Sequence, residues 1–93
     1  MEVTNMTTPV VSSETDATLR PLIRRAWAEV LSHNEFGDED YFFSVGGTSL
    51  AAIRLMRLVG LEVGHKLPIR LLFNHQTVAL LDEAVRRTLA NET

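Results

Sequence analysis

Apolar residues recur every three or four positions between Thr18 and Ser32, which is the spacing of one face of an α-helix. The apolar positions of this stretch are Leu19, Leu22, Ile23, Ala26, Trp27, Val30 and Leu31. Thr15 or Thr18 could cap the predicted helix, and Pro21 fits it only near the first turn. The charged residues that fall off the apolar stripe predict a solvated face, and they are Arg24, Arg25 and Glu29.

Three further helices are predicted in the second half of the chain. A helix over residues 49–63 would turn one apolar face inward, made of Ala52, Leu55, Met56, Val59 and Val63, and Gly64 is placed to end it. A short helix should begin at Leu67-Pro68 and run through Phe73. A last helix should span Thr77 to Leu89, with Thr77 as its cap. The positions expected to meet in one core are Trp27, Val30, Met56, Val59, Leu81 and Val85. No stretch alternates with period two, so the prediction is an all-α fold, a small four-helix bundle of three main helices and one short helix.

The segments outside the helices are a leader, a loop and a short tail. Met1 to Glu14 is polar and rich in Ser and Thr, which predicts a disordered leader. Residues 15–90 would form the domain, and residues 91–93 a frayed C-terminus. His33 to Val45 holds turn residues followed by three aromatic residues, which predicts a long loop anchored by its rings. A loop of this length in so short a chain is typical of a functional segment.

Composition narrows the classes of function. The chain has 93 residues, of which 45% are hydrophobic, so it fits one small domain with one core. A net charge of −3 argues against nucleic acid and anionic membranes and favours basic partners. There is no cysteine, so any thiol chemistry needs an added cofactor. No stretch approaches the roughly 20 apolar residues of a membrane span, and we expect a cytoplasmic monomer.

The candidate chemistry lies in the segment Asp40 to Leu50, which reads Asp-Tyr-Phe-Phe-Ser-Val-Gly-Gly-Thr-Ser-Leu. Gly46 and Gly47 permit a tight turn, because glycine enters positive φ without steric cost. Ser49 then stands at the start of the predicted helix. Unpaired backbone N–H groups and the positive end of the helix dipole favour a phosphate there. The simplest other interpretation is a glycine turn followed by a serine N-cap.

This segment resembles the attachment motif of the acyl and peptidyl carrier proteins. The similarity extends from about Leu19 to Leu89, and the double glycine resembles peptidyl carriers of nonribosomal peptide synthesis most. Thr48 stands where peptidyl carriers most often have His or Asp. The resemblance implies an acyl-carrier-protein fold and a non-catalytic carrier. Ser49 would accept 4′-phosphopantetheine from coenzyme A, and the site around it would comprise Gly46, Gly47 and Thr48. The arm would hold aminoacyl, peptidyl or acyl groups as thioesters in nonribosomal peptide or polyketide synthesis.

The resemblance also implies partners and a surface that they contact. The partners are a phosphopantetheinyl transferase, an adenylation or acyl-transfer enzyme, and condensing or tailoring enzymes. Carriers of this family are recognised largely through the helix after the attachment residue and the short helix that follows. The docking residues carried over to this chain are Leu50, Ile53, Arg54, Arg57 and Leu71.

Two other classes of function stay open at this point. One is a cofactor-free helical interaction module. The other is a fragment of a serine hydrolase, since Gly47-Thr48-Ser49 begins a Gly-x-Ser-x-Gly pattern in which Ala51 occupies the fifth position. His65, His75 and Asp82 could be drawn as triad partners, but their spacing does not require it. The three histidines have no metal-ligand spacing.

Overall fold

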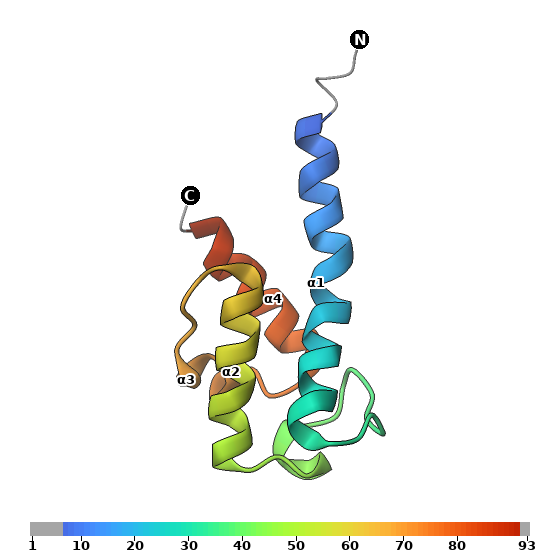
Figure 1. The fold of residues 1–93 in the computed structure, drawn as a ribbon, viewed down its shortest axis with the longest axis vertical. Coiled ribbons are helices and arrows are strands. Elements are labelled where there is room, and N and C mark those ends of the chain that lie inside the picture. The colour runs from blue at the N-terminus through green and yellow to red at the C-terminus, as the bar shows by residue number, and fades with distance from the viewer. Residues whose placement is uncertain (1–6, 92–93) are drawn as a thin grey trace.

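The computed structural model describes residues 7–91, with side chains from residue 19 onward. The elements are α1 (Thr7–Leu31), the short 3-10 helix η1 (Phe42–Val45), α2 (Ser49–Val63), α3 (Ile69–Asn74) and α4 (Val78–Asn91). Helix α1 packs against α2 and α4, and the short helix α3 packs against both α2 and α4 (Figure 1). No strand occurs in residues 7–91, so the predicted all-α bundle of three main helices and one short helix is confirmed.

Helix α1 begins earlier than the sequence pattern predicted. It starts at Thr7 rather than near Thr18, so residues 7–14 of the predicted leader are helical, while residues 1–6 lie outside the described residues. Extending a helix costs much less than nucleating one, which lets a packed segment continue into a polar stretch without an apolar stripe. Pro21 therefore lies inside the helix and not in its first turn. It is exposed there and removes one backbone hydrogen bond.

The remaining boundaries agree closely with the sequence pattern. The second helix has the predicted bounds, Ser49–Val63, and Gly64 ends it with φ of 69°. Thr77 caps α4, since its Oγ1 accepts a hydrogen bond from the Leu80 N–H at 3.1 Å. Asn91, the first residue of the predicted frayed tail, is the last residue of α4. Residues 92–93 lie outside the described part.

The core forms where α1, α2 and α4 meet. The Trp27 ring lies at its centre, with ring centroids 5.3 Å from Phe36 and 5.1 Å from Phe42. Of the predicted core positions, Trp27, Met56, Val59, Leu81 and Val85 are buried, whereas Val30 is only partly buried. The loop residues Phe36 and Phe42 therefore belong to the same core as the helices. Of the three rings predicted to anchor the loop, Phe42 is buried and Phe43 is partly buried, whereas Tyr41 is exposed; Phe36 was not among them.

A network of ion pairs joins the loop to α1 and α4. Arg20 Nη1 lies 3.1 Å from Asp38 Oδ2 and its Nη2 lies 2.8 Å from Asp82 Oδ2, while Arg24 also pairs with Asp38. Arg86 Nη2 lies 2.7 Å from Asp82 Oδ2. The apolar pattern predicted a solvated face for Arg24, but its guanidinium also stacks on the Phe36 ring at 5.0 Å from the centroid. The spacing of apolar residues in the helix could not reveal these two contacts of Arg24, because Asp38 and Phe36 both lie in the loop.

Candidate functional site

The loop before α2 is held at both of its ends. At its start, His33 Nδ1 accepts a hydrogen bond from the Glu35 N–H at 2.9 Å. The other ring nitrogen, Nε2, then donates to the Val45 carbonyl oxygen at 2.7 Å. Near its end, the Phe42 N–H donates to the Gln76 carbonyl at 2.8 Å. Sequence reasoning placed His33 in a loop without a role, and no local signal could have revealed its contact twelve residues away.

The two glycines are required for different reasons. Gly46 has φ of 111°, a left-handed conformation, and ends η1. Gly47 does not have a positive φ, but a Cβ placed on it would lie 2.4 Å from the Phe42 ring. Its N–H donates to the Phe42 carbonyl at 3.0 Å. The prediction that positive φ explains both glycines is therefore correct for Gly46 alone, and close packing explains Gly47.

Thr48 and Ser49 occupy successive positions at the start of α2 and have different roles there. Thr48 is the N-cap, since its Oγ1 accepts a hydrogen bond from the Ala51 N–H at 3.1 Å. The interpretation of Ser49 as an N-cap is thus wrong, because Ser49 is the first residue of the helix proper. Its side chain is exposed and makes no hydrogen bond to a described residue. The hydroxyl is therefore accessible from solvent.

The first turn of α2 also offers backbone donors beside that hydroxyl. The Ala51 N–H bonds to Thr48 Oγ1, and the Ala52 N–H bonds to the Thr48 carbonyl at 2.9 Å. The N–H groups of Ser49 and Leu50 have no acceptor among the described residues. Together with the positive end of the helix dipole, they favour an anion at this point.

The predicted docking residues do not all share one environment. Leu50 and Ile53 are 60% and 50% exposed, and Arg54 and Arg57 are exposed beside them. Leu71 is half-buried and packs against the core, so it offers less surface than predicted. Its carbonyl also contacts His75 Nδ1 at 2.8 Å.

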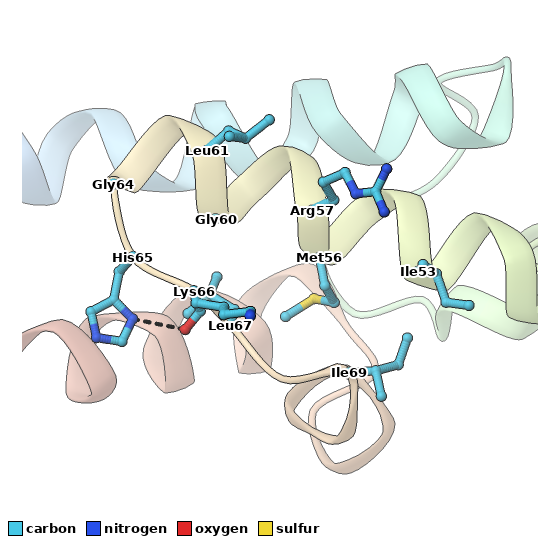
Figure 2. Close-up of a pocket in the computed structure, with 10 residues that line it drawn as sticks. All are labelled: Ile53, Met56, Arg57, Gly60, Leu61, Gly64, His65, Lys66, Leu67 and Ile69. Atoms are coloured by element: carbon cyan, nitrogen blue, oxygen red, sulfur yellow. Dashed lines mark hydrogen bonds between the residues drawn. The ribbon is translucent and has the colours of Figure 1, made fainter.

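A groove of about 630 Å³ lies between α2 and α3 on the same side as Ile53 and Arg57. Figure 2 shows Ile53 and Met56 extending from α2 towards Ile69 at the start of α3. The connection between the helices closes one end of the groove with Lys66 and Leu67. Gly60 lines it as well, and a Cβ there would lie 2.9 Å from the His65 carbonyl oxygen. No pattern in the sequence indicated this groove.

The three residues considered as partners of Ser49 in a hydrolase triad make other contacts in the structure. Asp82 is buried and bound to Arg20 and Arg86, which leaves it no part in activating a serine. His65 Nδ1 contacts the Lys66 carbonyl and His75 Nδ1 contacts the Leu71 carbonyl. In the described part of the chain, no group of three potential ligands could hold a metal ion, and no helix is long and apolar enough to span a membrane.

Comparison with known proteins finds one matching family model. The model of the phosphopantetheine attachment site matches residues 21–85, a range that includes the loop, both glycines and all of α2.

Relatives and a solved structure resemble the same region. Gramicidin S synthase 2 of Brevibacillus brevis is 40% identical over 60 residues, which is 64% of this chain and 1% of that protein. Phosphinothricin tripeptide synthetase PhsC of Streptomyces viridochromogenes is 41% identical over 66 residues, 71% of this chain and 6% of the synthetase. The chain thus spans only a few per cent of these relatives. The structure of BlmI, a type-II acyl carrier protein from Streptomyces verticillus involved in bleomycin biosynthesis, matches with a TM-score of 0.77 and 32% identity, covering 87% of this chain and 98% of that one.

Proposed function

Because this chain belongs to the phosphopantetheine attachment-site family, we propose that Ser49 is the residue that carries its 4′-phosphopantetheine arm. The family is one of carrier domains, which are non-catalytic parts of synthetase systems and hold intermediates as thioesters on the arm. This chain is a carrier domain with the fold of an acyl carrier protein. The observation that supports Ser49 is its exposed, unbonded hydroxyl at the first position of α2.

The residues around Ser49 fit a phosphate ester. The N–H groups of Ser49 and Leu50 and the positive end of α2 favour the negative charge of a phosphodiester. The neighbouring Thr48 hydroxyl is engaged in capping the helix, which leaves Ser49 as the accessible nucleophile of the pair. When bound, the arm supplies a terminal thiol, which this chain lacks because it has no cysteine.

We further propose that the cargo is an aminoacyl or peptidyl group of nonribosomal peptide synthesis or a related polyketide pathway. The similarity to gramicidin S synthase and phosphinothricin tripeptide synthetase supports this class. The proposed partners are a phosphopantetheinyl transferase, an adenylation or acyl-transfer enzyme, and condensing or tailoring enzymes. A cytoplasmic location and a monomeric state stay predictions.

We propose that these partners contact the exposed side chains of α2. Leu50 and Ile53 offer apolar area beside the attachment residue, and Arg54 and Arg57 offer charge. Exposed apolar anchors flanked by charge are typical of protein interfaces. Half-buried Leu71 would add contact only at the edge of this surface.

The test is the intact mass of the chain after incubation with coenzyme A and a broad-specificity phosphopantetheinyl transferase. We expect wild type to gain one phosphopantetheinyl group and Ser49→Ala to gain none. Ser44→Ala is the matched control, since Ser44 is also exposed and lies five residues earlier in the same segment. It should be modified like wild type.

An unmodified wild type, under conditions that convert another carrier, would refute the assignment. That result is also what a cofactor-free interaction module would give. Modification of the Ser49→Ala variant would show that the arm is attached to another hydroxyl.

A further inference from the structure

Charge is distributed unevenly between α2–α3 and the rest of the molecule. Residues 49–75, which hold both helices and their connection, contain four cationic side chains, Arg54, Arg57, Lys66 and Arg70, and one carboxylate, Glu62. The other residues contain five Lys and Arg against eleven Asp and Glu. A protein with net charge −3 therefore presents a cationic segment next to Ser49.

These cations differ from Arg20, Arg24 and Arg86 in having no carboxylate partner in the described part of the chain. Arg20, Arg24 and Arg86 pair with Asp38 or Asp82. By contrast, Arg54, Arg57, Lys66 and Arg70 are exposed, and none of them pairs with a carboxylate in the described part of the chain. Their charge is thus available to a partner.

The groove between α2 and α3 gives this charge an apolar centre. Met56 and Leu67 are buried at its base, while Ile53 and Leu61 are 50% and 74% exposed along it. Arg57 and Lys66 also line it, and Figure 2 shows the Arg57 guanidinium directed away from the groove's apolar base. An apolar floor with cationic edges suits an apolar side chain flanked by carboxylates.

We propose that the partner that docks on α2–α3 does so with an acidic protein surface that inserts an apolar side chain into this groove. The proposal rests on the proposed carrier function and specifies the chemistry of its partner. It reverses the expectation from net charge, which favours basic partners. Electrostatic interaction falls off within about 8 to 10 Å at physiological salt, so the charge near the contact outweighs the total.

Two short blocked peptides test the proposal on the isotope-labelled full chain, before and after attachment of the arm. Each has a central leucine and phenylalanine, flanked by glutamates in one peptide and by lysines in the other. We expect the glutamate peptide to bind at least about fivefold more tightly, with weaker binding at higher salt. Its amide shift changes should centre on Ile53, Arg57 and Lys66.

Charge-reversal variants locate the effect. Arg57→Glu should weaken binding of the glutamate peptide by about threefold or more. Arg87→Glu, which makes the same charge change at an exposed site on α4, should leave it nearly unchanged. Because both substituted positions are exposed, both variants should have melting temperatures near that of wild type.

Several results would overturn the proposal. These are equal or tighter binding of the lysine peptide, shift changes centred elsewhere, and no binding of either peptide at millimolar concentration. The same shift changes on concentrating the protein alone would indicate a second copy of this chain as the occupant, which also contradicts the proposal. Arm attachment is scored separately by intact mass, so its failure refutes the proposed function and not the docking chemistry.

Discussion

Gly46 and Gly47 show how a single residue type can be required by two different constraints. Gly46 has a backbone conformation that costs other residues energy. Position 47 requires glycine because the Phe42 ring occupies the space that a Cβ would need. Phe42 is buried against Trp27, so the ring cannot move away without disturbing the core. The position of Thr48 and Ser49 thus depends on a core aromatic residue in the preceding loop.

We therefore expect Gly47→Ala to destabilise the fold by about 1 to 3 kcal/mol, because the added methyl group overlaps the Phe42 ring. Gly37→Ala is the control, since the nearest atom to a Cβ there is Asp40 Oδ2 at 3.8 Å. It should change the unfolding free energy by less than about 0.5 kcal/mol. Urea unfolding of both variants measures the difference, and equal stability would mean that the ring can shift.

The long loop is positioned by its contacts with α1 and α4. Asp38 receives Arg20 and Arg24 from α1, and its carbonyl accepts a hydrogen bond from the Ala79 N–H of α4 at 3.1 Å. Asp82 links α4 back to Arg20, so one arginine contacts two carboxylates on separate elements. This arrangement joins the loop before Ser49 to α1 and to the first turns of α4.

The ion pairs of Asp38 predict a dependence of stability on pH. Partial burial by itself would raise the pKa of Asp38, but hydrogen bonds from Arg24 and Arg20 outweigh it and hold the pKa below its ordinary value of 3.8. The folded state therefore binds this proton less readily than the unfolded state. The resulting stabilisation is complete above about pH 4 and is lost as the pH falls through the lower folded pKa.

Asp38→Asn removes this contribution, so it should lower stability by up to about 1 kcal/mol near neutral pH. The difference from wild type should narrow as the pH falls below about 4, because the Asp38 carboxylate is protonated first in the unfolded state and only at lower pH in the folded state. Denaturation curves across this pH range provide the measurement. A constant difference between the two proteins at all pH values would show that the effect is steric and not electrostatic.

At the scale of the whole molecule, α1 is longer than the bundle that it supports. Figure 1 shows its N-terminal turns extending beyond the ends of α2 and α4. Among the side chains that the structure describes, which start at residue 19, the buried hydrophobic residues of α1 are Leu19, Ile23, Ala26 and Trp27. We therefore expect the folded unit that holds Ser49 to form without residues 1–13.

Deleting residues 1–13 should accordingly leave the melting temperature within about 2 °C of wild type. The total helical signal in circular dichroism should still fall, because residues 7–13 belong to α1. An unchanged signal would instead support a disordered leader over the whole predicted range. A marked loss of stability would mean that this stretch packs against the bundle.

Local patterns in the sequence determined the helices and the candidate serine. Apolar spacing predicted α2 and α4, Thr77 was identified as a cap, and the double glycine pointed to Ser49. These features depend on residues within a few positions of one another, so a one-dimensional pattern contains them. The start of α1 was predicted wrongly because helix propagation through a polar stretch has no apolar signature.

Tertiary structure alone decided the features that join distant parts of the chain. The clash that requires glycine at position 47 depends on the Phe42 ring, and the Arg20–Asp82 pair joins residues 62 positions apart. The groove brings residues of α2 together with residues of the following connection, which folds back so closely that the His65 carbonyl oxygen would lie 2.9 Å from a Cβ on Gly60. Such contacts depend on the path of the loops through space, which periodicity does not encode.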